Sequence, residues 1–268
     1  MPTQLCVLGG GVMGEALISR LILLNTFAAE AIAVGDPSPS RRQFLVDTYG
    51  VQAAADNTEV LSEAAVVLVA VKPQIFAKVA PDLQTIASQQ TSLLLSIMAG
   101  TPLSTLEAAA PGWPVVRAMP NTPATVGAGM TALAPGTHAQ AEDLKRAKQV
   151  FKAVGEVVEV PENLINAVTG LSGSGPGYVA VMIEALADGG VAAGLPRATA
   201  LELAIQTVKG TATLLQETDC HPGVLKDRVT SPGGTTIAGV TQLEIGGVRA
   251  SLINAVRAAC DRADELGT

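Results

Sequence analysis

Histidine and cysteine are scarce in this chain of 268 residues. The two histidines are His138 and His221, and the three cysteines, Cys6, Cys220 and Cys260, lie far apart in the sequence. None of these residues has the short spacing of a metal site, so we expect no multi-histidine centre and no bound metal. We interpret the cysteines as packing residues of a protein that is kept in a reducing compartment.

Charged residues are also few, at 15% against 48% hydrophobic residues, and the net charge is −7. Nucleic acid requires a basic surface, so we expect no nucleic-acid partner. The most apolar run, residues 64–71, is far shorter than the roughly 20 residues of a membrane helix, and no basic, apolar leader opens the chain. We therefore expect a cytoplasmic protein without a membrane partner, and its excess apolar surface indicates burial between subunits.

The first half of the sequence alternates short apolar runs with helical segments. We expect strands at residues 4–9, 31–36, 66–71, 92–98 and 115–119, and a glycine turn that opens a helix over residues 9–24. The segment PSPS at residues 37–40 has the composition of a turn followed by a helix cap. Alternating strands and helices predict a parallel sheet with right-handed crossovers, which is an α/β fold.

The strand pattern ends near residue 160, and apolar residues then recur at helical spacing, as in Leu201, Ile205 and Val208. We therefore expect a dinucleotide-binding domain of the Rossmann type over residues 1–160 and an all-α domain over residues 161–268. The helices of the second domain are rich in alanine and glycine, which permits close packing. An ordinary helical bundle and an interlocked pair of subunits both remain open.

A glycine-rich turn follows the first expected strand. Its glycines have the GxGxxG spacing, in which they allow a tight turn, approach of the backbone to a pyrophosphate, and close packing of helix on strand. The free N–H groups at the start of the next helix favour phosphate binding. The turn therefore predicts a dinucleotide site formed by Gly9, Gly10, Gly11, Val12, Met13 and Gly14.

The residues after the second expected strand give conflicting signals on the cofactor. Asp36 stands where a carboxylate binds the adenosine ribose of NADH and disfavours a 2′-phosphate. Ser38, Ser40, Arg41 and Arg42 follow at once and could hold that phosphate, although the arginines could equally be solvated residues of a first helical turn. From the residues alone, NADH and NADPH both remain open.

Four further segments resemble the pyrroline-5-carboxylate reductase family. They are AVKPQ at residues 70–74, MPNTP at 119–123, SGSGPGY at 172–178 and RVTSPGGTT at 228–236. They occur in the order of that family and span almost the whole chain. The resemblance implies reduction of L-1-pyrroline-5-carboxylate, a cyclic imine, to L-proline, the last step of proline biosynthesis. The cofactor is NADPH or NADH, and the resemblance slightly favours the assignment of NADPH.

The resemblance also implies an assembly and a set of site residues. The helical domain would form a dimer, and dimers of this family often assemble into rings. Its active site lies between the cofactor cleft of one subunit and the helical domains of the dimer. On the cofactor side the matched positions are Asn57 at the adenosine ribose, and Ala70, Val71, Lys72, Pro73, Ile97, Met98 and Ala99 along the nicotinamide. On the substrate side they are Glu162, Ser231, Gly233, Gly234, Thr235 and Thr236.

Three positions depart from the family pattern. Val12 and Arg228 stand where the family commonly has asparagine, and Gly177 replaces an alanine. The asparagine at the place of Arg228 often touches the cofactor, so that contact is in doubt here.

The segment from Ser231 to Thr236 suits the substrate chemistry. Its glycine turn precedes an apolar helical run, so Thr235 and Thr236 should lie at a helix N-terminus, where N–H groups can bind a carboxylate. Helix capping by threonine fits the same spacing. We expect the Thr236 hydroxyl to bond the imine nitrogen, whereas Glu162 either contacts substrate or only begins a helix. Lys72 suits backbone contacts with the cofactor better than acid catalysis.

Two other classes of function compete with this interpretation. A β-hydroxyacid dehydrogenase or another cyclic-imine reductase would share the layout, but hydroxyacid enzymes use a lysine in the long helix, and residues 176–194 contain none. A nucleotide sensor on the same fold needs no substrate loop, which the segment from Ser231 to Thr236 provides.

Overall fold

The computed structural model describes residues 4–267. The chain forms two compact units, one of residues up to 174 together with those from 258 onward, and one of residues 175–257. Within the described part of the chain, no helix is long and apolar enough to cross a membrane.

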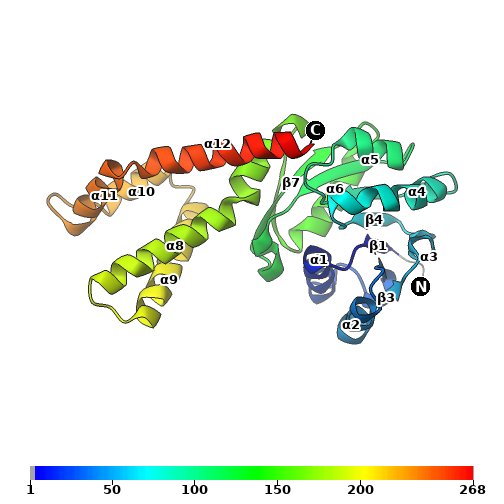
Figure 1. Ribbon diagram of the computed structural model, residues 1–268, viewed down its shortest axis with the longest axis horizontal. Helices are drawn as coiled ribbons and strands as arrows, with labels where there is room; N and C mark the ends of the chain where they lie inside the picture. Colours follow the sequence, from blue (N-terminus) through cyan, green and yellow to red (C-terminus); the bar gives the residue numbers. More distant parts are fainter. Residues whose placement is uncertain (1–3, 268) are drawn as a thin grey trace. The chain divides into compact units, whose positions relative to one another are not determined.

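The first unit is built on one eight-stranded sheet in the order β3-β2-β1-β4-β5-β6-β7-β8 (Figure 1). The five strands expected from the sequence are present as β1, β2, β4, β5 and β6. The strands are β1 Leu5–Leu8, β2 Ile32–Gly35, β3 Gln52–Ala54, β4 Val66–Val69, β5 Leu93–Ser96, β6 Val115–Met119, β7 Gly129–Pro135 and β8 Gly155–Glu159.

The five expected strands pair in parallel, which confirms the expected parallel sheet, but β7, a strand that the sequence did not predict, runs antiparallel to β6. Only a short 3-10 segment, Thr122–Val126, connects the two strands. That connection is too short for the crossover that a parallel pair needs, so the chain reverses direction. The other neighbouring strands pair in parallel, including β7 with β8 through the intervening helix α6 (Ala141–Lys152).

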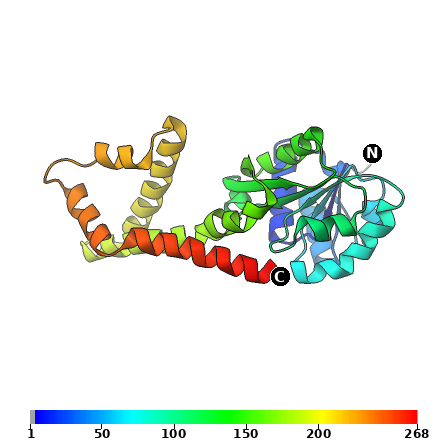
Figure 2. The same ribbon diagram turned by 90° about the horizontal axis from the view of Figure 1, so that it is seen from above.

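Helices cover both faces of this sheet (Figure 2). Cys6 and Leu8 of β1 enter one hydrophobic core, whereas Leu5 and Val7 enter the other, because successive strand residues point to opposite faces. The central strands are therefore apolar throughout. The helices of this unit are α1 Val12–Leu23, α2 Pro39–Tyr49, α3 Asn57–Leu61, α4 Phe76–Ala87, α5 Leu103–Ala109, α6 and α7 Ile165–Val168; short 3-10 turns lie at Ala29–Ala31, Pro73–Ile75 and Glu162–Leu164, and a π-helical turn at Thr169–Gly173.

The second unit is entirely helical in its described residues, as expected. It contains α8 Gly175–Ala192, α9 Arg197–Thr218, α10 Pro222–Arg228, α11 Thr235–Ile245 and the first part of α12 Val248–Gly267, whose residues from 258 belong to the first unit. Helices α8 and α9 lie side by side as a hairpin (Figure 1). Small residues allow the approach, because a Cβ added at Gly190 would lie 3.0 Å from the Cβ of Ala200.

This unit buries very little apolar surface within the single chain. Its buried hydrophobic residues are only Ala187, Ala200 and Ala204 among residues 175–257. Large apolar side chains are exposed on every one of its helices, for example Val181 at 65% and Ile245 at 74%. A self-contained bundle would cover such side chains, so this unit has the surface of a domain that associates with a partner.

Candidate active site

The turn after β1 has the geometry of a phosphate cradle. Gly9 has a φ of +101°, and a Cβ there would lie 2.9 Å from the carbonyl oxygen of Ala70. A Cβ at Gly14 would overlap the carbonyl oxygen of Gly9, which fixes the start of α1 against the turn. Gly11, in contrast, has open space where a Cβ would be. Helix α1 begins at Val12, so its first N–H groups have no acceptor within the helix and are suited to bind a phosphate.

The strand order places this cradle at the switch point of the sheet. β1 pairs with β2 on one side and with β4 on the other, so the crevice opens at the carboxyl ends of these strands. Four of the predicted cofactor segments follow parallel strands that end at this same edge. They are Gly9–Gly14 after β1, Asp36 and Ser38 after β2, Ala70–Pro73 after β4, and Ile97–Ala99 after β5.

Asp36 binds the glycine turn directly. Its Oδ2 accepts a hydrogen bond from the Gly10 N–H at 3.0 Å, and its Oδ1 accepts one from the Ser38 N–H at 2.9 Å. The Ser38 hydroxyl accepts from the Arg41 N–H at 3.3 Å and so caps α2, as the sequence predicts. The carboxylate therefore ties the end of β2 to the phosphate cradle.

Asn57 is the first residue of α3, and its side chain lies over the end of β2. A Cβ at Gly35 would lie 2.5 Å from the Asn57 Oδ1, while the Asn57 Nδ2 donates to the Asp82 carboxylate at 2.9 Å. The amide oxygen is thus placed beside the strand end that carries Asp36.

Arg41 and Arg42 both have protein partners in place of free, solvated side chains. Arg42 donates to the carbonyl oxygens of Asp36 at 2.7 Å and Pro37 at 2.9 Å. The Nε of Arg41 donates to the Gly10 carbonyl, and its Nη2 pairs with the Glu15 carboxylate.

Glu15 is a residue of this region that the sequence analysis did not identify. It lies in the first turn of α1, and its Oε1 also accepts a hydrogen bond from the Tyr49 hydroxyl at 2.8 Å. Partial burial works to raise the pKa of Glu15, but the hydrogen bonds from Arg41 and Tyr49 and the charge of Arg41 outweigh it and lower that pKa. No local sequence pattern connects residues 15, 41 and 49; only the packing of α2 beside α1 does.

The segments predicted to line the nicotinamide are held by backbone bonds. The Ala70 N–H donates to the Leu8 carbonyl at 2.8 Å, and the Ile97 N–H donates to the Val69 carbonyl at 3.1 Å. The Met98 side chain is buried in the core, whereas Lys72 is exposed and precedes the 3-10 turn at Pro73–Ile75.

Glu162 has structural partners inside the first unit. Its Oε1 accepts from the Leu103 N–H at the start of α5, at 2.6 Å, and from the Arg117 Nη1 at 3.1 Å. The Arg117 side chain on β6 is only 7% exposed. Glu162 does begin a short helix after Pro161, and a contact with substrate stays a prediction.

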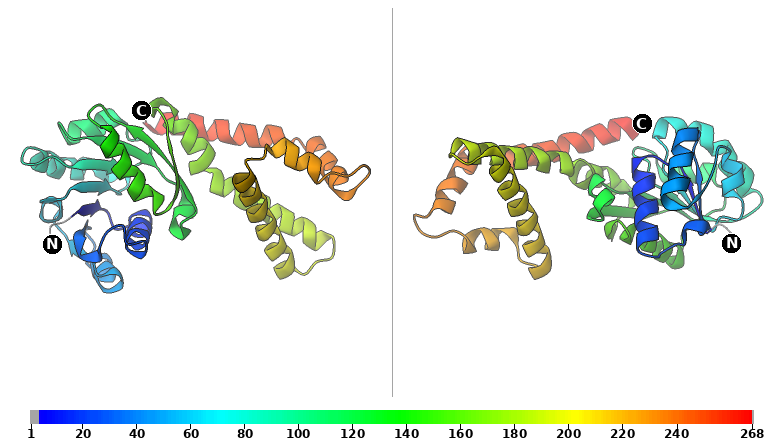
Figure 3. Two further views of the ribbon diagram at one scale, coloured as in Figure 1. Left: turned by 180° about the vertical axis from the view of Figure 1, so that it is seen from behind. Right: turned by 90° about the horizontal axis from the view of Figure 1, so that it is seen from below.

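The predicted substrate loop belongs to the second unit, where Figures 2 and 3 show it between α10 and α11. Gly233 has a φ of +68°, and the Gly234 N–H donates to the Ser231 carbonyl at 3.0 Å, which closes a tight turn. Helix α11 begins immediately afterwards, at Thr235.

The two threonines of this loop are not used as helix caps. The N-cap of α11 is Gly234, and no side-chain cap bond is formed there. In the described part of the chain, the Thr236 hydroxyl has no hydrogen-bond partner, whereas Thr241 of the same helix donates to the Ile237 carbonyl at 2.8 Å. A half-buried hydroxyl without a protein partner is therefore available to a ligand.

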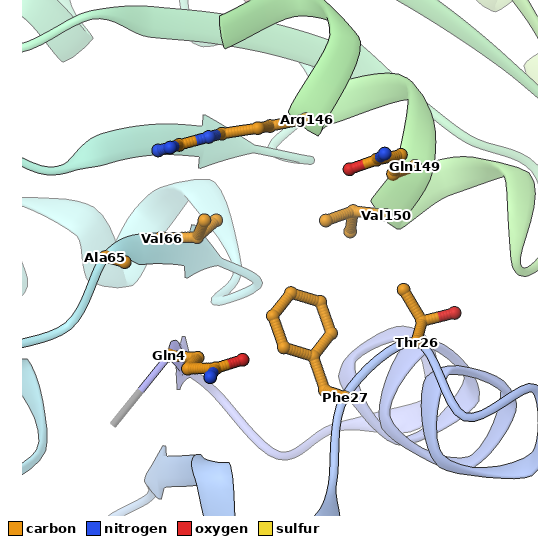
Figure 4. Close-up of a pocket in the computed structure, with 8 residues that line it drawn as sticks. All are labelled: Gln4, Thr26, Phe27, Ala65, Val66, Arg146, Gln149 and Val150. Carbon is orange, nitrogen blue, oxygen red and sulfur yellow. The ribbon is translucent and has the colours of Figure 1, made fainter. Parts of the chain in front are cut away.

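A cavity of about 370 Å³ lies at the opposite edge of the sheet (Figure 4). Gln4 and Ala65 in its wall precede β1 and β4, so it belongs to the amino ends of the strands. It takes no part in the cofactor crevice. Among residues 4–267, no three histidine, cysteine or acidic side chains are grouped to hold a metal ion.

Comparison with known proteins gives matches over both halves of the chain. Residues 162–266 match the family model described as pyrroline-5-carboxylate reductase dimerisation. Residues 4–100 match the model described as NADP oxidoreductase coenzyme F420-dependent.

Individual relatives match over the whole length. A pyrroline-5-carboxylate reductase of Synechocystis sp. is 55% identical over 267 residues, covering 100% of this chain and 99% of the relative. A solved pyrroline-5-carboxylate reductase of Coxiella burnetii is 35% identical, with a TM-score of 0.94 and full coverage of both chains. A solved pyrroline carboxylate reductase of Plasmodium falciparum with NADP bound is 31% identical, with a TM-score of 0.87 and coverage of 99% and 98%.

These matches agree with the phosphate cradle at the switch point and with the four sequence segments found above. They extend from the glycine turn to the end of the helical unit, and one relative shares more than half of all residues. The chain therefore belongs to the pyrroline-5-carboxylate reductase family.

Proposed function

We propose that this chain reduces L-1-pyrroline-5-carboxylate to L-proline, with a nicotinamide dinucleotide as the hydride donor, as the last step of proline biosynthesis. The observation that carries the proposal is the unpartnered Thr236 hydroxyl at the N-terminus of α11, in a chain whose other unit has a dinucleotide cradle. The full-length relatives that bear this name support it.

The cofactor supplies the redox chemistry, so the protein has to bind, orient and polarise. The N–H groups at the start of α1 and the open face of Gly11 would hold the pyrophosphate. Ala70–Pro73 and Ile97–Ala99, with their backbones fixed by β1 and β4, would line the nicotinamide. Asn57 would contact the adenosine ribose.

The substrate carries a carboxylate and an imine nitrogen. The turn of Ser231, Gly233 and Gly234 would place N–H groups of α11 around the carboxylate, with Thr235 beside them. The Thr236 hydroxyl would bond the imine nitrogen and orient the ring, or relay a proton from water, since a hydroxyl is itself a poor acid. Glu162 is retained as a candidate substrate contact.

Of the two dinucleotides, we propose NADPH as the cofactor. Both oxygens of Asp36 already accept hydrogen bonds from backbone N–H groups of the turn, which partly compensate its negative charge. Ser38 and Ser40 at the start of α2 offer hydroxyl donors for a 2′-phosphate, and the Arg41 guanidinium beside them would contribute by exchanging its protein partners. The NADP-bound Plasmodium relative supports this choice.

The minimal active assembly in this proposal is a homodimer formed through the helical unit, and rings of dimers would be a higher assembly. The match to a dimerisation model and the exposed apolar side chains of residues 175–257 support association. We place the enzyme in the cytoplasm.

The test follows the absorbance of NADPH and of NADH with purified protein, with and without racemic pyrroline-5-carboxylate. We expect loss of absorbance that depends on the imine, with proline as the product. Binding of both dinucleotides without oxidation of either would contradict the proposal and favour a nucleotide sensor. Oxidation with another cyclic imine only would favour a related reductase.

A further inference from the structure

The guanidinium of Arg41 lies at the adenosine end of the predicted cofactor site. Arg41 is in the first turn of α2, three residues after Ser38, and its Nε reaches the carbonyl of Gly10 in the phosphate cradle. This is the region where the ribose 2′-position of a dinucleotide lies in this fold. A phosphate at that position would need a guanidinium as its main charged partner.

The edge of Arg41 that suits a phosphate is already occupied. Arginine binds phosphate bidentately through two parallel N–H groups, commonly those on Nε and one Nη. Here the Nε bonds to the Gly10 carbonyl and the Nη2 pairs with the Glu15 carboxylate. The side chains of both partners are about three-quarters shielded from solvent, so solvent screens the pair only in part.

Two aromatic residues of α2 hold this arrangement in place. The Tyr49 hydroxyl donates to the other oxygen of Glu15 at 2.8 Å, so both carboxylate oxygens are engaged. The ring of Phe44 lies under the Arg41 guanidinium, 4.9 Å from its central carbon to the ring centroid. Phe44 and Tyr49 themselves meet edge to face.

We infer that Glu15 determines cofactor specificity as a positioning residue: it holds the phosphate-binding edge of Arg41 and thereby lowers the preference for NADPH over NADH. A 2′-phosphate must compete with the Glu15 carboxylate for the Nη2 donor, and it also meets the negative charge of that carboxylate. A 2′-hydroxyl meets neither obstacle. The inference rests on the proposed dinucleotide site.

The experiment measures dissociation constants of NADP⁺ and NAD⁺ for the full-length protein, by titration calorimetry at fixed ionic strength. In Glu15→Gln, Arg41 keeps its charge but loses its charged partner. We expect the ratio of NADP⁺ affinity to NAD⁺ affinity to rise about three- to fivefold, the range of a partly screened ion pair. Tyr49→Phe, which only loosens Glu15, should shift the ratio in the same direction by a smaller factor.

Two further variants separate this effect on cofactor specificity from a general disturbance of the folded structure. In the double variant Glu15→Gln with Arg41→Gln, the gain should disappear, because no guanidinium is left to release. Glu159→Gln on β8 removes a carboxylate paired with Lys148 at 2.5 Å, and should leave the ratio unchanged although it alters the net charge equally.

The inference would be overturned if Glu15→Gln changed the NADP⁺ and NAD⁺ affinities equally, or lowered the ratio of NADP⁺ to NAD⁺ affinity. If Glu15→Gln does not fold, the same comparison in Tyr49→Phe decides the question. Because binding is measured without the imine, this result is independent of the proposed reaction. A protein that binds both dinucleotides with the expected shift but does not reduce the imine would retain the inference and lose the proposed function.

Discussion

Glu162 and Arg117 are 45 residues apart in sequence and form an ion pair, with 3.1 Å between the carboxylate Oε1 and the guanidinium Nη1. The same oxygen accepts the Leu103 N–H, so one carboxylate joins β6, α5 and the segment that leads to α7. A buried charge that loses its partner is costly, because its desolvation is no longer compensated.

We expect Glu162→Ala to lower the free energy of unfolding by about 1–3 kcal/mol, below the usual cost for a fully buried pair because Glu162 is itself 35% exposed. Denaturant titration measures this loss. Kinetics of the more conservative variant Glu162→Gln then separate the two roles of the residue. An unchanged KM for the imine indicates a structural role alone, whereas a raised KM confirms the predicted substrate contact.

Thr236→Ala tests the role of the free hydroxyl in α11. We expect kcat to fall by about 10²–10⁴-fold, the range for a group that orients or relays a proton at the reacting atom. Thr241→Ala is the matched control, since its hydroxyl is bonded to the Ile237 carbonyl in the same helix. An unchanged kcat in Thr236→Ala would remove that residue from the mechanism.

Gly14 and Gly11 should respond differently to alanine. At Gly14 a Cβ overlaps the Gly9 carbonyl oxygen, so Gly14→Ala should destabilise the cofactor-free protein by about 1–3 kcal/mol. At Gly11 a Cβ meets only open space, so Gly11→Ala should change the melting temperature of the cofactor-free protein far less and yet weaken dinucleotide binding. Thermal melts and binding titrations of both variants measure the contrast; equal loss of stability in the two would contradict it.

The contribution of Glu15 to stability should depend on pH. Its pKa in the folded chain lies below its ordinary value of 4.5, because the bonds from Arg41 and Tyr49 and the charge of Arg41 outweigh partial burial. A lowered folded-state pKa gives stability that is complete above about pH 4.5 and is lost as the pH falls through the folded value.

The measurement compares melting temperatures of the wild-type protein and Glu15→Gln between pH 7 and pH 3. We expect a constant difference down to about pH 4.5 and a shrinking one below it. Glu159→Gln serves as the control, since other carboxyl groups titrate in the same range. A difference that does not change over the whole range would show that the ion pair with Arg41 contributes nothing.

Much of the fold is predictable from local sequence. The central strands β1, β4 and β5 are almost continuous apolar runs, because both faces of each strand are covered. The glycine turn can be recognised because all of its glycines lie within one short segment at a fixed spacing. The sequence also predicts a helix cap within residues 37–40 on local grounds, and Ser38 provides it.

The missed elements depend on their neighbours. β8 contains Glu156 and Glu159 and forms the edge of the sheet, where pairing with β7 decides its conformation more than its own composition. The reversal at β7 depends on the length of a connection, which no residue pattern marks. In the candidate site, the glycine turn could be read from sequence, whereas the contacts of Glu15 with Arg41 and of Glu162 with Arg117 arise only when distant segments pack together.

The three buried alanines of residues 175–257 also bear on how the chain reaches its folded state. Apolar burial is the main driving force of folding, and this unit can obtain little of it alone. In the proposed dimer, these helices would therefore gain most of their stability from contacts with the second chain. By mass action we then expect the midpoint of unfolding to rise with protein concentration.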